Sequence, residues 1–345
     1  MAVAAELRDS GAAVSFLGTR ERIEAELVPA AGVEIEFFEA RGIDRRNPLR
    51  AARAGFEALG AVFAARRALR RRRADVVIGG GGFVAGPAGL AAILSGTPLV
   101  LTEADSHLGL ANRLLAGRAR QVCLAFPIAG REGERYEVTG RPVPEAVLSA
   151  DRAAARQRFG VAAGDRCLLV MGGSQGARSI NLAAIEAFAE GAAGGGERDF
   201  HVLHLTGRRN HDELAARLAA APHRERYTLI AFAPEIGDVL ASSDLVLARS
   251  GGSIYEVVAA GRPALLVPYP HAPADHQTAN AAWRERGGAA IVVADEELSA
   301  EWLRRQVGEL FAGPARLEEM AAAARALAKP DAARRIADLV LEAAR

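Results

Sequence analysis

The residues best suited to chemistry lie in one glycine-rich run, Met171 to Arg178, which reads MGGSQGAR. The run follows a short apolar segment, Cys167 to Val170, and opens into a segment with helical character, Ser179 to Glu190. Glycines between a strand and a helix allow backbone N–H groups to approach an anion, and the helix N-terminus adds partial positive charge. The pattern predicts a diphosphate-binding turn. It has neither a P-loop lysine nor G-x-G-x-x-G spacing, so it suits a ligand held by its phosphates rather than phosphoryl transfer.

A second glycine cluster follows an apolar segment in the first half of the chain, between Asp75 and Pro87. Its four glycines, Gly79 to Gly82, end a predicted strand, and we expect the next helix to begin near Pro87. The cluster either brings the backbone close to a ligand or only permits tight packing of helix on sheet. Two such clusters at the carboxyl ends of strands favour a ligand, because open α/β sheets bind their ligands at that edge.

Polar residues accompany a third turn, Arg249 to Ser253. Glu256 lies in the first turns of the helix predicted after it, where a carboxylate can accept two hydrogen bonds from the vicinal hydroxyls of a ribose. It can equally complement the helix dipole. Further on, Asp275, Gln277 and Asn280 are candidates for hydrogen bonds to sugar hydroxyls, although Asp275 taken alone reads as a helix N-cap.

Apolar runs that alternate with helical stretches must position these residues. The runs lack strict alternation of apolar and polar residues, which indicates strands buried on both faces in parallel sheets covered by helices. Repeated β–α units predict an α/β fold with two doubly wound domains. The predicted strands are Ala13–Leu17, Val33–Phe38, Val76–Ile78, Leu99–Thr102, Gln121–Ala125, Cys167–Met171, His201–Leu205, Thr228–Ala231, Leu245–Ala248, Ala264–Pro268 and Ala289–Val293.

The boundary between the two domains is expected at Gly140–Pro144, where one glycine and two prolines interrupt the pattern. The prediction assigns residues 1–145 to the first domain and residues 146–329 to the second. The final helix, residues 330–345, is expected to pack back on the first domain. The segment Met1–Leu7 reads as the middle of a helix, so we expect a strand and a loop to precede it.

The composition excludes several classes of function. Of the 345 residues 50% are hydrophobic and 25% charged, and the net charge is +1, which is typical of a globular protein and gives no electrostatic reason to expect a nucleic-acid partner. Lys329 is the only lysine, which excludes Schiff-base chemistry. Cys123 and Cys167 lie in apolar runs and are expected to be buried thiols. No metal-ligand motif is present. The longest apolar stretch, Val84–Leu101, is interrupted by glycines and prolines, so it is not a membrane span.

The stretch from Leu49 to Arg73 combines apolar and basic residues. Its apolar side chains fall on one helical stripe, and arginines surround them. Such a surface suits anionic lipid headgroups. The alternative is an ordinary helix with its stripe in the core and its arginines in solvent. The stripe consists of Leu49, Ala52, Phe56, Leu59 and Phe63.

Taken together, these motifs resemble the MurG family of GT-B glycosyltransferases, the GlcNAc transferases of peptidoglycan synthesis. The resemblance extends over essentially the whole chain, and its most specific part is Gly172–Arg178 with Asn181 behind it. It is supported by Asp75–Pro87, by Arg249–Gly251 with Glu256, and by His276–Thr278 with Asn280.

The resemblance implies two Rossmann-like domains that face each other across a cleft. It implies transfer of GlcNAc from UDP-GlcNAc to the C4 hydroxyl of an undecaprenyl-linked muramyl-pentapeptide, with inversion of the anomeric centre. The enzyme would work without a cofactor or a metal ion, as a peripheral protein on the cytoplasmic face of the bacterial membrane. A UDP-GlcNAc 2-epimerase and an inactive UDP-sugar-binding protein remain alternatives.

The resemblance also implies roles for residues of the second domain. Ser174 and neighbouring amides would hold the donor diphosphate, Glu256 the ribose hydroxyls and Gln277 the GlcNAc hydroxyls, while Ala233 would lie beside the uracil. The predicted donor-site residues are Gly172, Gly173, Ser174, Gln175, Gly176, Arg178, Phe232, Ala233, Gly251, Gly252, Ser253, Glu256, Gln277 and Asn280.

In the first domain, Gly80, Gly81 and Gly82 would face the diphosphate of the acceptor. Glu103 and Asp105 fall where the family has polar residues near the reaction centre, and they are the catalytic candidates, with Asp105 also a substrate-binding residue. An inverting transfer needs one general base to deprotonate the acceptor hydroxyl.

Overall fold

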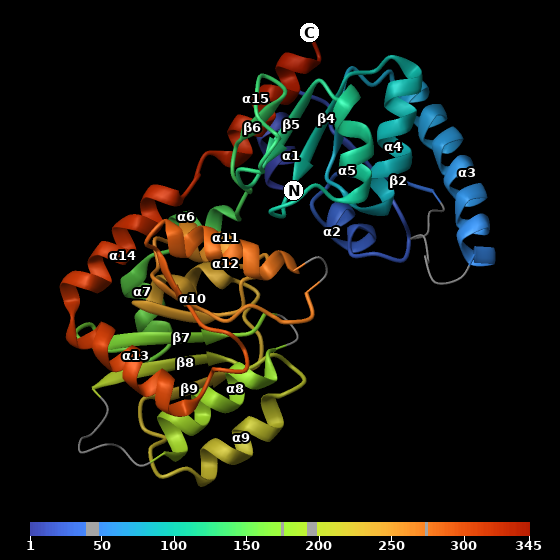
Figure 1. Ribbon diagram of the computed structural model, residues 1–345. Coiled ribbons are helices and arrows are strands. Elements are labelled where there is room, and N and C mark those ends of the chain that lie inside the picture. The colour runs from blue at the N-terminus through green and yellow to red at the C-terminus, as the bar shows by residue number, and fades with distance from the viewer. Residues whose placement is uncertain (39–47, 174–175, 192–198, 273–274) are drawn as a thin grey trace. The chain divides into compact units, whose positions relative to one another are not determined.

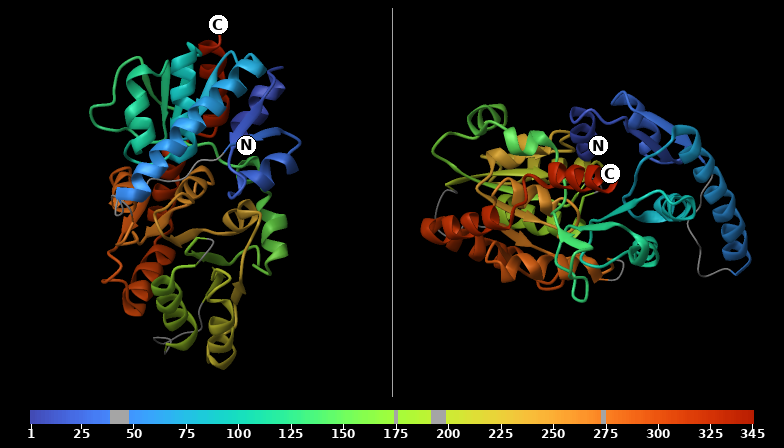
Figure 2. Two further views of the ribbon diagram at one scale, coloured as in Figure 1. Left: turned by 90° about the vertical axis from the view of Figure 1, so that its right-hand side faces the viewer. Right: turned by 90° about the horizontal axis from the view of Figure 1, so that it is seen from above.

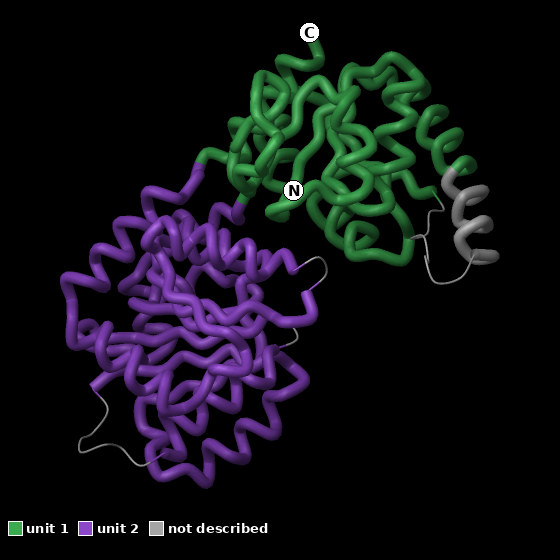
Figure 3. The backbone as a smooth tube through the Cα atoms, viewed as in Figure 1, with its two compact units in different colours: residues 1–142, 331–345 green, residues 143–330 purple. Residues whose placement is uncertain are grey.

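The computed structural model describes residues 1–38, 48–173, 176–191, 199–272 and 275–345, and of residues 48–58 it describes only the backbone (Figure 1). The chain divides into two compact units (Figure 3). Unit 1 comprises Met1–Pro142 and Asp331–Arg345, and unit 2 comprises Val143–Pro330. None of the described helices has the length and apolar character that crossing a bilayer requires.

Unit 2 is built on one sheet, in which the described residues form six parallel strands in the order β12–β11–β10–β7–β8–β9. Every residue of β10 (Leu245–Ala248) and of β8 (Phe200–Leu205) is buried, because helices cover both faces of the sheet. This burial explains the absence of polar alternation in the sequence. The other strands are β7 (Arg166–Met171), β9 (Tyr227–Ile230), β11 (Ala264–Leu266) and β12 (Ala290–Val292).

The helices of unit 2 form two groups, one on each side of the sheet (Figure 1). On one side, Ile180 and Leu303 pack with Leu168 of the sheet in the largest core cluster. That side carries α8 (Arg178–Ile185), the π-helical turn η2 (Glu186–Glu190), α9 (His211–Ala220) and α13 (Ala300–Ala312). The other helices are α6 (Glu145–Ser149), α7 (Arg152–Arg158), α10 (Ile236–Ser242), α11 (Ile254–Ala259), α12 (His276–Arg286) and α14 (Pro314–Leu327).

Unit 1 contains a sheet of parallel strands in the order β3–β4–β5–β6 and a separate parallel pair, β1–β2. The strands are β1 (Ser15–Gly18), β2 (Glu34–Phe37), β3 (Val77–Gly79), β4 (Leu99–Glu103), β5 (Gln121–Leu124) and β6 (Tyr136–Val138). The helices are α1 (Ala2–Asp9), α2 (Glu24–Ala30), α3 (Pro48–Arg72), α4 (Gly82–Ser95), α5 (Leu110–Leu115), the 3-10 turn η1 (Ala116–Arg118) and α15 (Ala332–Ala343).

Two apolar layers enclose the larger sheet of unit 1. Side chains of α3, α4 and α5 form one layer, and Figure 2 shows α3 running along the outside of this unit beside α4. The second layer comes from α1 and from α15, which returns to unit 1 after the whole of unit 2. Ile336 and Val340 of α15 pack there against Val100 and Cys123 of the sheet. Arg335 of α15 also donates two hydrogen bonds to Glu137, at 2.6 and 2.7 Å.

The sequence predicted the elements well but not all their ends. Every predicted strand is present, displaced at its ends by at most two residues. Among the strands that the structure describes, only the three-residue edge strand β6 was not predicted. The prediction that a helix begins near Pro87 is wrong, because α4 begins at Gly82 and contains this proline. Gly81 and Gly82 have φ angles of 80° and 73° and complete the turn, so the helix starts earlier and loses only one N–H donor at the proline.

The prediction of buried thiols is confirmed. Cys123 and Cys167 are free, buried cysteines, and burial raises the pKa of each to about 12. Both thiols therefore stay protonated at physiological pH and act as small apolar side chains of their sheets.

Candidate functional site

The glycine-rich run of unit 2 forms the connection between β7 and α8. Gly173 and Gly176 have φ angles of 82° and 80°, which other residues rarely adopt. A side chain on Gly176 would also collide with the carbonyl oxygen of Thr206, which lies 2.2 Å from the Cβ position. The Gly176 N–H donates to the Gly173 carbonyl at 3.0 Å, so this amide stabilises the turn itself. Two predicted contacts, Ser174 and Gln175, lie outside the described residues.

Among the residues that the structure describes, no side chain caps the N-terminus of the helix behind this turn. The N-cap residue of α8 is Ala177, whose side chain cannot cap the first N–H groups. Asn181 is buried and fixes the first turns by donating to the Thr206 carbonyl at 2.8 Å, while its Oδ1 lies 3.0 Å from Nε2 of His204. The other ring nitrogen of His204 lies 2.8 Å from the Tyr227 hydroxyl. Burial lowers the pKa of His204 to about 3, so the ring is neutral and its role is structural.

Arg178, a predicted donor-site residue, has its charge paired within the protein. Its guanidinium donates to both carboxylate oxygens of Glu213, at 2.6 and 3.0 Å, and this ion pair raises the pKa of Arg178. Both side chains are exposed, so the pair is weak and can open. Arg178 therefore lies beside the turn, but its guanidinium contacts Glu213 of α9.

The third predicted turn lies between β10 and α11, next to the start of α12. Gln277 accepts a hydrogen bond from the Tyr269 N–H at 3.0 Å, and its Nε2 lies 3.4 Å from the Cβ position of Gly251. Asn280 is 1% exposed and donates to the Ser250 carbonyl at 3.1 Å. The Asn280 amide nitrogen therefore anchors the turn from inside, and the contact of Asn280 with sugar hydroxyls stays a prediction.

Three further predicted donor residues surround this turn. Gly252 is exposed, Ser253 is the half-buried N-cap residue of α11, and Glu256 is half-buried in the first turn of that helix. Asp275 precedes α12 as predicted but does not cap it with a backbone bond. Its φ is 51°, and its Oδ1 accepts from the Thr278 hydroxyl at 2.6 Å.

Arg249 connects its own loop after β10 with the segments that follow β11 and β12 and with the first turn of α8. It donates to the carbonyl oxygens of Val267 and Pro268, to Asp295 at 2.6 Å and to the Ser179 hydroxyl at 2.8 Å. Its side chain is 12% exposed. In the sequence, Arg249 stands out only as part of the turn Arg249 to Ser253. An arginine directly after a fully apolar strand is the signal that could have identified its buried role.

Phe232 and Ala233 follow β9 at the same edge. The Phe232 ring is 41% exposed, and the guanidinium carbon of Arg208 lies 4.7 Å from its centroid. Arg208 follows β8 and was not predicted, because only the fold brings the two loops together.

In unit 1, Glu103 ends β4 and is 9% exposed. Its two carboxylate oxygens accept from the N–H groups of Ala104, Asp105 and Gly109, at 3.0, 3.2 and 2.8 Å, and from the Asn112 amide at 2.9 Å. These four donors occupy the carboxylate, so the geometry favours a positioning role for Glu103. Asp105 is half-buried in the loop that Glu103 holds.

In unit 1, the glycine cluster precedes the N-terminus of α4, which also lacks a side-chain cap. Gly81 is the N-cap residue of the 14-residue helix α4 and provides no side-chain cap. A side chain on Gly82 would meet nothing within 4 Å, whereas one on Gly79 would lie 3.0 Å from Leu101. Gly79 therefore serves packing, while Gly81 and Gly82 serve the backbone turn and leave the helix N-terminus open.

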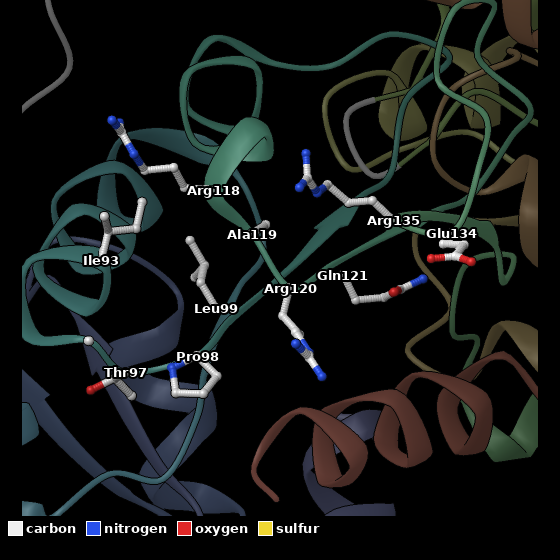
Figure 4. A pocket seen from close by; sticks show the side chains of 11 residues that line it. Ile93, Thr97, Pro98, Leu99, Arg118, Ala119, Arg120, Gln121, Glu134 and Arg135 are labelled. Carbon is white, nitrogen blue, oxygen red and sulfur yellow. The ribbon is translucent and has the colours of Figure 1, made fainter.

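A cavity of about 820 Å³ also lies in unit 1, at the beginnings of β4 and β5 (Figure 4). It is lined by Arg118, Arg120 and Arg135, whose side chains spread away from one another. No predicted site residue lines it. Since ligands of parallel sheets bind at the carboxyl ends of strands, we do not assign the reaction to this cavity.

Comparisons with known proteins agree with the predicted family. Residues 1–124 match the glycosyltransferase family 28 N-terminal domain, and residues 167–336 match the C-terminal domain. The chain is 39% identical to the UDP-N-acetylglucosamine–N-acetylmuramyl-(pentapeptide) pyrophosphoryl-undecaprenol N-acetylglucosamine transferase of Moorella thermoacetica, over 99% of this chain and 94% of the relative. The protein of that name from Halorhodospira halophila is also 39% identical, over 100% and 94%.

Solved structures give the same result. The crystal structure of Acinetobacter baumannii MurG superposes with a TM-score of 0.81 at 31% identity, covering 99% of this chain and 94% of that one. A UDP-GlcNAc 2-epimerase from Neisseria meningitidis, bound to UDP-GlcNAc, has a TM-score of 0.67 at 15% identity, covering 99% and 95%. That second likeness shows a common fold alone, and the predicted GT-B fold is confirmed.

Proposed function

Because the chain belongs to the family of UDP-GlcNAc–N-acetylmuramyl-(pentapeptide) pyrophosphoryl-undecaprenol GlcNAc transferases, we propose that it catalyses the reaction in that name. GlcNAc passes from UDP-GlcNAc to the C4 hydroxyl of the undecaprenyl-linked muramyl-pentapeptide, and the anomeric centre is inverted. The observation that carries the proposal is the 39% identity over 99% of the chain.

The test is a transfer assay with radiolabelled UDP-GlcNAc and the lipid-linked acceptor in detergent. We expect a labelled lipid product and stoichiometric UDP. Conversion of UDP-GlcNAc alone into its 2-epimer would support the isomerase instead. Tight UDP binding with no turnover in either assay would indicate an inactive binding protein.

The proposed donor site uses the carboxyl edge of the unit 2 sheet. The turn after β7 and the uncapped N-terminus of α8 hold the diphosphate. Glu256 accepts from the ribose hydroxyls, Ala233 lies beside the uracil, and Gln277 faces the GlcNAc. When the bond between the sugar and the diphosphate breaks, negative charge grows on UDP. Fixed N–H dipoles aimed at that charge stabilise the transition state.

The proposed acceptor site uses the equivalent edge of unit 1. Gly80–Gly82 and the open N-terminus of α4 hold the acceptor diphosphate. Asp105 takes the proton of the C4 hydroxyl as the general base. Glu103 supports it by binding the Asp105 N–H and fixing the loop.

Donor-site variants should separate two kinds of contact. Glu256→Ala should weaken UDP binding about tenfold or more, because a carboxylate loses its hydrogen bonds to the ribose. Gln277→Ala should reduce discrimination between UDP-GlcNAc and UDP-glucose more than it reduces UDP affinity. Calorimetric titration and competition assays measure both effects. Unchanged donor kinetics in both variants would contradict the proposed site.

We also propose that unit 1 binds the cytoplasmic face of the membrane as a peripheral surface. The side chains of Leu49, Ala52 and Phe56 lie outside the described residues, but Leu59 and Phe63 of α3 are 56% and 69% exposed. The helix instead buries a different stripe, which includes Val62, Ala65 and Leu69. Exposed leucines continue onto the neighbouring helices as Leu90 and Leu94 of α4 and Leu110 and Leu114 of α5.

Replacing both Leu59 and Phe63 by glutamate should lower binding to phosphatidylglycerol vesicles about tenfold or more, because apolar insertion is lost and negative charge is added. Vesicle sedimentation measures the change. Leu148→Glu is the matched control, since Leu148 is an equally apolar residue of unit 2 with 44% exposure. Equal losses in the control and the double variant would exclude α3 as the membrane surface.

A further inference from the structure

Arg208 is an exposed cation at the edge of unit 2 to which the proposed donor site gives no role. It lies three residues after the end of β8, in the loop between β8 and α9. Its guanidinium lies 4.7 Å from the centroid of the Phe232 ring, which follows the neighbouring strand β9. A guanidinium over an aromatic face keeps its N–H edge available to other partners.

The loop that carries Arg208 touches the diphosphate turn. β8 lies between β7 and β9, so its loop stands between the turn after β7 and Phe232 after β9. The Cβ position of Gly176 lies 2.2 Å from the Thr206 carbonyl oxygen and 2.6 Å from the amide nitrogen of Asn210. Arg208 lies between these two contacts in the sequence. The loop that carries Arg208 is thus in contact with the turn, and the Arg208 side chain lies against Phe232, next to the proposed uracil position.

Arg208 differs from two other arginines at this edge, whose charges are paired within the protein. Arg178 is paired with Glu213, and Arg249 is paired with Asp295. Among the residues that the structure describes, no carboxylate forms an ion pair with Arg208; its recorded contact is the Phe232 ring. The glycine-rich turn itself contains no lysine. Arg208, which lies against Phe232, is therefore a candidate to supply the positive charge that a lysine in the turn would provide.

We propose that Arg208 binds the diphosphate of the nucleotide-sugar donor, with Phe232 orienting its guanidinium. This inference rests on the proposed function and adds a residue to the donor site. A guanidinium forms charge-assisted hydrogen bonds with phosphate oxygens. During transfer, the acceptor oxygen bonds to the anomeric carbon, and the electron pair of the breaking bond moves to the leaving phosphate oxygen. Arg208 stabilises that oxygen.

Binding of UDP and of uridine, each measured by calorimetric titration, separates a phosphate contact from a base contact. We expect Arg208→Ala to weaken UDP binding about tenfold or more and to leave uridine binding within about twofold, because only UDP carries the diphosphate. Arg208→Lys should retain part of the UDP affinity, since charge remains but the planar fork is lost. Arg209→Ala is the matched control: Arg209 is the next residue, is exposed and should leave both affinities unchanged.

Three results would overturn the inference: unchanged UDP affinity in Arg208→Ala, equal losses for UDP and uridine, or the same loss in Arg209→Ala. Thermal unfolding of each variant shows whether a loss reflects misfolding, and Arg208→Lys then provides a second test. If the unmodified protein binds UDP and transfers GlcNAc while Arg208→Ala binds UDP normally, only this inference fails. If the unmodified protein binds no UDP, the proposed function fails as well.

Discussion

Replacing Asp105 by asparagine should lower kcat by a factor of about 10² to 10⁴, because the amide keeps the size of the side chain but cannot accept the acceptor proton. The KM for UDP-GlcNAc should stay within about twofold, since the proposed donor contacts all come from unit 2. Steady-state kinetics with the lipid-linked acceptor measure both quantities.

The control for this assignment is Glu103→Gln. The amide group that replaces the carboxylate would confront four hydrogen-bond donors, so we expect lower thermal stability and a higher KM for the acceptor. The kcat should fall much less than in Asp105→Asn. If Glu103→Gln causes the larger loss of kcat and Asp105→Asn changes kcat little, the two roles are reversed and Glu103 is the base.

Arg249→Met should destabilise unit 2 by about 3 to 5 kcal/mol, because it leaves the Asp295 carboxylate and two backbone carbonyls without their shared donor. Trp283 and Trp302, the two tryptophans of the chain, both lie in unit 2, so urea unfolding followed by their fluorescence reports on this unit. The KM for UDP-GlcNAc should rise about tenfold or more, because the loops lose the side chain that ties them together.

A second substitution separates the two expected effects of Arg249→Met, the loss of stability of unit 2 and the displacement of its loops. Arg249→Met with Asp295→Leu replaces the ion pair by apolar groups and should recover part of the stability but not the KM. Arg158→Ala removes an exposed pair with Asp238 and should change the stability by less than about 1 kcal/mol. A normal KM in the double variant would show that Arg249 is only a stabilising residue.

The sequence alone was sufficient to predict the fold, because the patterns that indicate strands and turns are local. The apolar strands Cys167–Met171 and Leu245–Ala248 and the glycines after them can be recognised within about ten residues, and the structure has both strands with turns at their carboxyl ends. The start of α4 was misplaced for the same reason: Pro87 is a strong local signal, and the positive φ angles of Gly81 and Gly82 are not visible in the sequence.

The details of the candidate site were harder because they depend on contacts between distant residues. Arg178 pairs with Glu213, 35 residues later, and Arg249 with Asp295, 46 residues later. The burial of Asn280 depends on the turn at Ser250. Spacing along the chain identifies which residues are polar, but only the packed loops decide which of them remain available to a ligand.

The path of the chain also determines the order in which the protein can mature on the ribosome. Residues 1–142 are translated first, yet α15, which covers one face of their sheet, follows only after residue 331. Until α15 leaves the exit tunnel, Val100 and Cys123 lack its apolar cover. Unit 1, whose synthesis begins first, is therefore completed after unit 2. During that interval the nascent chain exposes an apolar sheet face of the kind that chaperones bind.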